Sequence, residues 1–536
     1  MSVYILLAAI IILACLFLNK VSSKLGLPML LAFILLGMLF GSDGLFKIPF
    51  DNYAISEQIC SVSLIFIMFY GGFGTKWSTA KPIAQKAILL STLGVVLTAL
   101  ATGLFCFYAL KFDFLESMLI GAVISSTDAA SVFSVLRSKH LNLKDNTAPL
   151  LEVESGSNDP CSYMLTIVVL TMMSGDFNGG QLLYMIFAQI AFGVLVGILV
   201  AIVAAFVLSR FKFVTDGFDT IFVFSMALVA YAAATLIGGN GYLSTYIAGI
   251  ILGNKSINNK KTLMHFFDGV TGLMQMLIFF LLGLLSFPSQ LFPIFLQALA
   301  IALFLTFVAR PLSVFAILSP FKCSINQQLL VSWAGLRGAA SIVFAIMATV
   351  SPAYMRNDIF HIVFFIVLFS ISLQGSLITV AAKKLNMIDN QSNVMKTFSD
   401  YSEEMPVQFI KLTIYPSHPW VNKKIKNITL LPDFLLVLIL RGKEKIVPNG
   451  STVIRAGDLV VLSALSLEDD IGVCLAEVTV DKDSMYLGKL LAEAKFGDDR
   501  LVVVVKRDNK TIIPNGKTVV KENDVLIFNQ SCCSSK

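Results

Sequence analysis

A stretch of acidic, amide and hydroxyl side chains interrupts an apolar part of the chain at residues 151–160, which read LEVESGSNDP. Residues four apart on a helix face the same side, so Glu154 would lie beside Asn158 and Ser155 beside Asp159. The stretch therefore brings a carboxylate, an amide and a hydroxyl to one side of a helix.

Pro160 ends this stretch and frees a further oxygen. It has no N–H, so the carbonyl of Gly156 loses its helical hydrogen-bond partner. Oxygen-rich surroundings without thiols suit a hard cation such as Na⁺, K⁺ or Li⁺. A low dielectric favours the neutral form of a carboxyl group, so an acid here could also carry a proton.

A second polar stretch, residues 121–131, reads GAVISSTDAAS and also lies within an apolar segment. Hydroxyl and carboxylate side chains compete for backbone hydrogen bonds, which favours local unwinding of a helix. Thr127 and Asp128 could cap the helix at such a break. The pattern predicts a discontinuous helix with polar groups at the break.

The third unusual place is Arg337, in the apolar stretch 333–341 (WAGLRGAAS). A charge at the bilayer centre costs about 2.5–3.5 kcal/mol, so such residues are functional candidates. The neighbouring glycines permit a broken helix and the close approach of another helix. Arginine keeps its proton and needs an acid, and we expect a structural ion pair with Glu154.

Composition shows what must position these groups. The 536 residues are 56% hydrophobic and 14% charged, against about 45–50% and 25% in soluble domains. Apolar runs long enough to span a bilayer predict an all-α membrane part of thirteen spans. These begin near residues 3, 26, 57, 86, 115, 149, 180, 217, 241, 262, 289, 325 and 357.

Basic residues in the short loops predict the orientation. Alternate loops carry groups such as Lys76/Lys81/Lys86 and Lys255/Lys260/Lys261, whereas the opposite loops hold Lys47, Lys111 and Arg356. The positive-inside rule places the basic loops and the C-terminus in the cytoplasm and the N-terminus outside.

The C-terminal part contains an internal repeat. Residues 409–462 align without gaps to residues 475–528, and each copy carries a Pro-Asn-Gly turn, at 448–450 and 514–516. Strands, a short helix and this turn predict a small α/β unit in each copy. The pattern resembles the C-terminal (TrkA-C) subdomain of RCK regulatory modules, without their dinucleotide-binding half.

The three membrane stretches together resemble the signature stretches of electroneutral NhaP-type cation/proton antiporters, and with the tail the chain is similar to CvrA-like potassium/proton antiporters. The resemblance covers essentially the whole membrane part. It implies inverted six-helix repeats whose discontinuous helices cross near the midplane. It also implies a list of cation ligands: Thr127, Asp128, Ser155, Asn158 and Asp159, the last also being the proton carrier.

One position departs from that family pattern. In residues 67–73 (IMFYGGF), relatives usually carry Asp or Glu where this chain has Tyr70. A phenol is not a charged ligand at neutral pH, so ion affinity, preference or coupling could differ. The span that holds Asp268 and His265 is also interrupted, and we interpret both as polar groups near a span end.

Two other classes of protein fit parts of the pattern less well. A cation channel gated by RCK-like domains should carry a carbonyl filter such as TVGYG, and the sequence has none. An enzyme or an ATP-driven pump should show motifs such as HExxH, GxSxG or a nucleotide-binding loop, which are also missing. We therefore expect a secondary antiporter of K⁺ or Na⁺ against H⁺, with no enzymatic activity and no cofactor.

The predicted organisation follows. We expect an exchanger domain at residues 1–384 and a linker at residues 385–404. Two RCK C-terminal-like subdomains follow at residues 405–467 and 468–531, and a tail at residues 532–536. The location is the bacterial inner membrane, and the partners are the membrane and a second copy in a homodimer. The tail could bind a cytosolic nucleotide or cyclic dinucleotide, and we expect no nucleic-acid partner.

Overall fold

The computed structural model divides the chain into two compact units, residues 1–394 and 395–536. It describes the chain except for a set of short segments, so the predicted tail and most of the predicted linker lie outside the described residues. Those segments are residues 1, 26–27, 129–131, 133–140, 142, 176–177, 212–216, 256, 258–259, 354, 390–406, 431–433, 443, 466–472, 483, 495, 497–499, 508–509, 513, 515 and 532–536.

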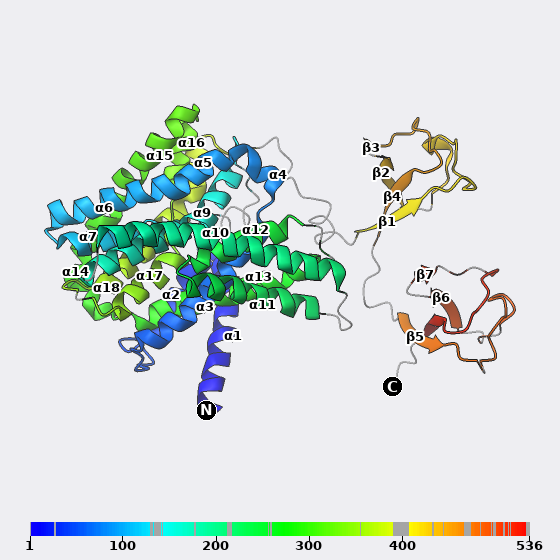
Figure 1. Cartoon of the computed structure of the whole chain (residues 1–536), viewed down its shortest axis with the longest axis horizontal. Coiled ribbons are helices and arrows are strands. Elements are labelled where there is room, and N and C mark those ends of the chain that lie inside the picture. Colours follow the sequence, from blue (N-terminus) through cyan, green and yellow to red (C-terminus); the bar gives the residue numbers. More distant parts are fainter. Residues whose placement is uncertain are drawn as a thin grey trace. The chain divides into compact units, whose positions relative to one another are not determined.

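The first unit is a bundle of helices packed side by side (Figure 1). Its first half contains α1 (Ser2–Leu25), α2 (Met29–Phe40), α3 (Tyr53–Gly74), α4 (Trp77–Ala80), α5 (Ala84–Leu89), α6 (Val95–Leu110), α7 (Phe114–Val123) and α9 (Thr147–Met173). Its second half contains α10 (Gly179–Arg210), α11 (Phe218–Leu236), α12 (Gly241–Gly253), α13 (Lys260–Leu285), α14 (Pro288–Phe304), α15 (Arg310–Leu318), α16 (Ile325–Trp333), α17 (Ala339–Val350), α18 (Ile359–Phe369) and α19 (Ser376–Lys384).

Seven helical segments among the described residues are long and apolar enough to cross a membrane. They are Tyr53–Gly74, Lys81–Leu110, Gly179–Arg210, Phe218–Leu236, Thr262–Leu285, Phe292–Phe321 and Ile359–Lys384. Shorter apolar helices accompany them at Leu6–Leu18, Met29–Phe40, Phe114–Val123, Gly241–Gly253 and Ala339–Val350. The helical membrane architecture predicted from the sequence is therefore confirmed.

Two helices are broken where the sequence predicts. α7 ends at Val123 and is followed by non-helical backbone at residues 125–128, and α16 is separated from α17 by non-helical backbone at residues 335–338. The two non-helical segments meet, because the N–H of Asp128 donates to the carbonyl of Leu336 at 2.8 Å. Each break thus supplies backbone hydrogen-bonding groups to the other.

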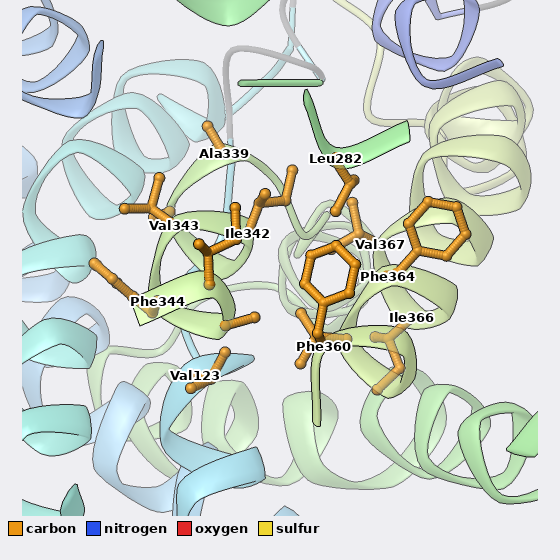
Figure 2. Close-up of a cluster of buried hydrophobic side chains, with 14 of the residues drawn as sticks. Val123, Leu282, Ala339, Ile342, Val343, Phe344, Phe360, Phe364, Ile366 and Val367 are labelled. Carbon is orange, nitrogen blue, oxygen red and sulfur yellow. The ribbon is translucent and has the colours of Figure 1, made fainter. Parts of the chain in front are cut away.

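Apolar packing holds the broken helices in place. Figure 2 shows side chains of α17 and α18 converging with Val123 of α7 and Leu282 of α13. Phe344 and Phe364 are fully buried in this cluster. Since Val123 directly precedes the first break and α17 directly follows the second, the polar crossing rests on a close-packed core.

The second unit contains two antiparallel four-stranded sheets. The first has strand order β1-β4-β2-β3 and consists of β1 (Val407–Thr413), β2 (Leu435–Arg441), β3 (Glu444–Ile446) and β4 (Leu459–Leu465). The second repeats this topology as β5-β8-β6-β7, with β5 (Val473–Thr479), β6 (Arg500–Arg507), β7 (Lys510–Ile512) and β8 (Val525–Ser531). The internal repeat read from the sequence thus corresponds to two copies of one topology.

The same ion pair, between a buried aspartate and a partly exposed arginine, stabilises both copies. Arg441 donates to both carboxylate oxygens of Asp458 at 2.8 and 2.9 Å, and Arg507 does so to Asp524 at 2.7 Å for each bond. The bonds from Arg441 hold the pKa of Asp458 below its usual range. Burial alone would raise the pKa of Asp524, but the bonds from Arg507 and Lys521 outweigh burial and lower it.

The prediction of an α/β unit in each copy needs correction, because the described tail is β-rich. The predicted short helix of the first copy is a 3-10 turn at Ile425–Asn427 with adjoining turns. The N–H groups of Asn422, Ile425 and Lys426 donate to carbonyls of residues 450–454, at 2.8, 3.0 and 3.1 Å. Backbone donors used across the fold are not available for a continuous α-helix.

Residues 385–389, predicted as the start of the linker, pack on the membrane unit instead. The N–H of Lys144 donates to the carbonyl of Met387 at 2.9 Å, and Ile388 forms an antiparallel bridge with Leu143. Met387 is buried. The exchanger unit therefore continues beyond α19.

Candidate cation and proton site

The two non-helical segments and the helix α9 build the candidate site. Asn158 of α9 donates through Nδ2 to the hydroxyl of Thr127 at 2.6 Å, and Ser155 donates to the carbonyl of Thr127 at 2.9 Å. Both bonds reach the first break at the same residue. The structure thus brings together two of the stretches that the sequence singled out.

The second break completes the crossing next to Asp128. Gly338 lies so close that a Cβ there would fall against the Asp128 side chain. No larger residue fits without moving the carboxyl group. Glycine at this position therefore allows the two broken helices to cross where Asp128 and Asp159 lie near each other.

Asp159 and Asn158 present unused oxygens at this point. The Oδ1 atoms of both residues are buried and have no hydrogen-bond partner in the described part of the chain. Asn158 donates its amide N–H to Thr127, while its amide oxygen accepts no hydrogen bond from a described residue. A buried acceptor without a donor costs about 1–3 kcal/mol, and a cation or a proton on Asp159 would remove that cost.

Glu154 is paired with Arg310 and not with Arg337, which corrects the sequence-based pairing. Arg310 Nη2 donates to Glu154 Oε1 at 2.5 Å, and both side chains are buried. Arg310 directly follows a π-helical turn, Leu305–Ala309, and its side chain passes so close to Gly335 that a Cβ there would lie 2.8 Å from Nε. This route across the second break carries the guanidinium to Glu154.

Arg337 serves the first break instead. Its Nη1 donates to the carbonyls of Ser125 and Ser126 at 3.0 and 2.6 Å. Its own N–H donates to Ser370 at 3.1 Å, within the π-helical turn Ser370–Gly375. Arg337 therefore neutralises the partial negative charge of carbonyls that unwinding has freed at the end of α7.

Arg310 is the residue that sequence reasoning missed. It lies within the apolar run Phe292–Phe321, so the argument that singled out Arg337 applies to it equally. The adjoining Pro311 gives no warning of a functional role, because proline is tolerated in the first turn of a helix. The sequence signal that could have identified Arg310 as a candidate is an arginine within an apolar run long enough to span the membrane.

Tyr70 has an acidic partner on another helix. Its hydroxyl donates to Asp268 Oδ1 of α13 at 3.0 Å. Asp268 is exposed in the structure, and Tyr70 is partly buried. A carboxylate from α13 therefore lies beside the position on α3 where the family pattern has an acid.

Burial changes along α9 at the candidate site. Glu152 is exposed and residues 155–157 are partly buried, whereas residues 158–162 are all buried. Asp159 thus lies within a fully buried turn of α9, with partly buried residues at 155–157 before it and at 163–165 after it.

This arrangement defines a helical membrane transporter with a buried, oxygen-lined site. Comparison with known proteins gives the family: a transmembrane sodium/hydrogen exchanger model matches residues 7–384, and TrkA-C domain models match residues 409–466 and 475–528. The chain belongs to the sodium/hydrogen exchangers, carries two TrkA-C domains, and is a cation/proton antiporter.

Named relatives are similar over most of the chain. The K(+)/H(+) antiporter NhaP2 of Shewanella sp. (strain MR-4) is 31% identical over 85% of this chain and 80% of its own length. The K(+)/H(+) antiporter NhaP of Alkalimonas amylolytica is 31% identical over 93% and 88%.

A solved structure shares the fold of the membrane unit. The sodium proton antiporter MjNhaP1 of Methanocaldococcus jannaschii at pH 8 superposes with a TM-score of 0.62 at 24% identity, covering 71% of this chain and 99% of that chain. The predicted resemblance to NhaP-type antiporters with a TrkA-C tail is confirmed.

Proposed function

We propose that the chain exchanges K⁺ for H⁺ through alternate occupation of Asp159, with Thr127, Asp128, Ser155 and Asn158 completing the cation site. The observation that carries the proposal is the pair of buried, unused Oδ1 atoms on Asn158 and Asp159. K⁺ is favoured as the cargo because the relatives that align over most of the chain are named K(+)/H(+) antiporters.

The chemistry follows from the charges at the site. With the cation bound, the Asp159 carboxylate is ionised and its charge is compensated; when the cation leaves, a proton takes its place and compensates the same charge. Asn158 contributes an oxygen without a charge, and of the two acids at the site, Asp128 and Asp159, only Asp159 alternates between the two ions in this proposal. Exchange of one cation for one proton is electroneutral.

Glu154 and Arg310 have a structural role in this scheme. Their ion pair neutralises two charges that would each be costly in the membrane interior. Arg337 holds the unwound backbone through Ser125 and Ser126, so Thr127 stays in reach of Asn158.

The proposed topology has thirteen spans, with inverted repeats of six spans on either side of α10, in the inner membrane of a bacterium. The basic loops and the tail face the cytoplasm, as the distribution of Lys and Arg predicts. In this orientation the Thr147 end of α9 is cytoplasmic, and exchange requires that Asp159 be reached in turn from the two sides of the membrane.

The tail, in this proposal, regulates exchange in a homodimer by binding a cytosolic nucleotide or cyclic dinucleotide. A ligand changes a transport equilibrium through unequal affinities for its two states. Truncation after Asp389 keeps the contacts of Met387 and Ile388, and should preserve exchange while changing its response to pH or nucleotides. Identical rates, pH profiles and nucleotide responses in both proteins would leave the tail without a regulatory role.

Dye-monitored proton flux in everted membrane vesicles tests the transport proposal. Addition of K⁺ should dissipate a preformed proton gradient, without a change of membrane potential, and Na⁺ and Li⁺ should do so less well. Asp159→Asn should insert into the membrane and show no exchange, whereas Asp51→Asn, an exposed acid outside the site, should behave as wild type. Near-normal exchange by Asp159→Asn would remove the central claim.

A further inference from the structure

A cluster of aromatic side chains lies one helical turn beyond Asp159 on α9, on the side that is outer in the proposed orientation. Tyr163 lies four residues beyond Asp159 on α9, and its ring packs edge-on against Tyr242 of α12 with centroids 5.0 Å apart. Tyr242 in turn packs against Tyr231 of α11 at 5.0 Å. Phe344 of α17 contacts Tyr163 and Tyr242 at 5.8 and 6.3 Å. The cluster thus joins four helices one turn beyond Asp159.

Oxygen atoms continue from this cluster toward the outer end of α3. The Tyr242 hydroxyl hydrogen bonds with Ser61 and Tyr231, and Ser61 donates to Glu57 Oε1 at 2.8 Å. Glu57 lies one turn inside the Asn52 cap of α3. Hydroxyl oxygens and one carboxylate therefore extend from near the start of α3 to the aromatic cluster that lies one turn beyond Asp159.

Local sequence makes room for this arrangement. Gly241 has no Cβ, and one there would lie 2.5 Å from a ring carbon of Tyr231. Asn240 donates to the carbonyl of Pro160 at 2.8 Å, which holds the start of α12 against α9 next to the site. The phenol cluster is therefore positioned by the same residue, Pro160, that closes the site stretch.

Glu57 lies in the outer half of α3 without a basic side chain paired to it among the described residues. Its carboxylate interacts electrostatically with Tyr163 and Tyr231. The Glu57 carboxylate is partly buried and accepts a hydrogen bond from Ser61, and carboxylate and hydroxyl oxygens are suitable ligands for a monovalent cation. A bound cation would supply the missing positive charge.

We propose that Glu57, Ser61 and the phenol oxygens of Tyr163, Tyr231 and Tyr242 form a second, outer site for the transported cation. This outer site rests on the proposed function. The ion occupies it between the outer solution and Asp159, and in the present state the packed rings separate it from Asp159. In the outward-facing state, rearrangement of the rings opens the path, and Tyr163 then passes the ion along α9.

Sided transport kinetics test this outer site. The full chain is measured in right-side-out and in everted vesicles, and the KM for K⁺ is determined on each face. Glu57→Gln keeps the size and the Ser61 contact but removes the charge, and should raise the ratio of outer to inner KM about fivefold. Tyr242→Phe should raise it about twofold to threefold, because one oxygen ligand is lost. Glu57→Asp, which keeps the charge, should stay near wild type.

Two controls separate a site from less specific effects. Asp51→Asn removes an exposed acid near the same helix end, and Tyr53→Phe removes a hydroxyl from α3 outside the cluster. Both should leave the KM ratio unchanged; an equal rise with Asp51→Asn would show a general surface potential and overturn the proposal. If Glu57→Gln does not accumulate, Tyr242→Phe decides, and an unchanged ratio contradicts the site.

The same kinetic measurements distinguish a failure of the outer-site proposal from a failure of the proposed exchange function. A wild-type protein without K⁺-dependent proton flux on either face would remove the proposed function. A wild-type protein that exchanges normally, with an unchanged KM ratio in Glu57→Gln and Tyr242→Phe, would remove the outer site alone.

Discussion

Replacing Arg310 with methionine removes the cation that faces Glu154 while keeping most of the side-chain volume. Both residues are buried, at 2% and 1% exposure, and their contact is 2.5 Å long. Loss of one partner leaves the other charge buried and unpaired, which costs about 3–5 kcal/mol. Arg310→Met and Glu154→Gln should therefore each be strongly destabilising.

The double variant Arg310→Met/Glu154→Gln should be more stable than either single variant. Neither uncompensated charge remains in it, and replacement of a buried ion pair by neutral side chains is often close to neutral in stability. The coupling energy, calculated from the two single variants and the double variant, should be at the upper end of about 0.5–3 kcal/mol.

A matched double-mutant cycle combines Glu154→Gln with a change at Arg337, whose guanidinium donates to the carbonyls of Ser125 and Ser126. Arg337→Met should destabilise the protein by leaving those carbonyls without their charged donor. Its coupling to Glu154→Gln should be clearly smaller than that of Arg310→Met. The two cycles thus separate the observed pair from the pair that the sequence suggested.

Reversible unfolding in mixed detergent micelles measures these free energies, with fluorescence and helical circular dichroism as two probes. Insertion and yield of each variant in membranes provide an independent readout if a single variant unfolds irreversibly. Strictly additive losses for Arg310 and Glu154, or a stronger coupling of Glu154 to Arg337, would refute the reasoning.

Three further outcomes follow from the structure. Gly338→Ala should place a Cβ against Asp128 and reduce the exchange rate more than tenfold, since overpacking costs about 1–3 kcal/mol. The control is Gly269→Ala, at a glycine with open space around it, and equal exchange rates in both variants would contradict the crossing geometry. Tyr70→Phe removes the donor and Asp268→Ala the acceptor of one hydrogen bond, so their effects on the cytoplasmic KM for K⁺ should be non-additive, whereas independent effects would show that the contact does not matter for the ion. Hydrogen bonds lower the pKa of Asp458 in the folded tail, so its contribution to stability is present above the unfolded pKa of about 3.9 and is lost as pH falls through the folded pKa. Hydrogen exchange of the full chain at pH 7 should show that Asp458→Asn increases opening of the first copy and leaves the second unchanged. Equal protection of both copies in this variant would argue against the ion pair as a stabilising contact.

Much of the fold could be read from patterns within single segments. Apolar run length predicts membrane helices because one helix must cover the hydrocarbon thickness by itself. The breaks near Asp128 and Arg337 were visible because polar and small residues change the local preference of the backbone. The tail repeat was visible because two copies of one sequence satisfy the same local constraints. The short helix expected in each copy was wrong, since its backbone donors bond across the fold.

The sequence by itself determined which groups could do the chemistry: Asn158, Asp159 and Thr127 stand out because acids, amides and hydroxyls are rare in apolar helices. Tertiary structure decided which of them meet. The partner of Glu154 lies 156 positions away and the partner of Tyr70 lies 198 away. Such pairings depend on where helices cross, and that is set by close approaches such as Gly338 against Asp128. Two arginines of equal charge were available for Glu154, and only the path of each side chain through the packed crossing distinguishes them.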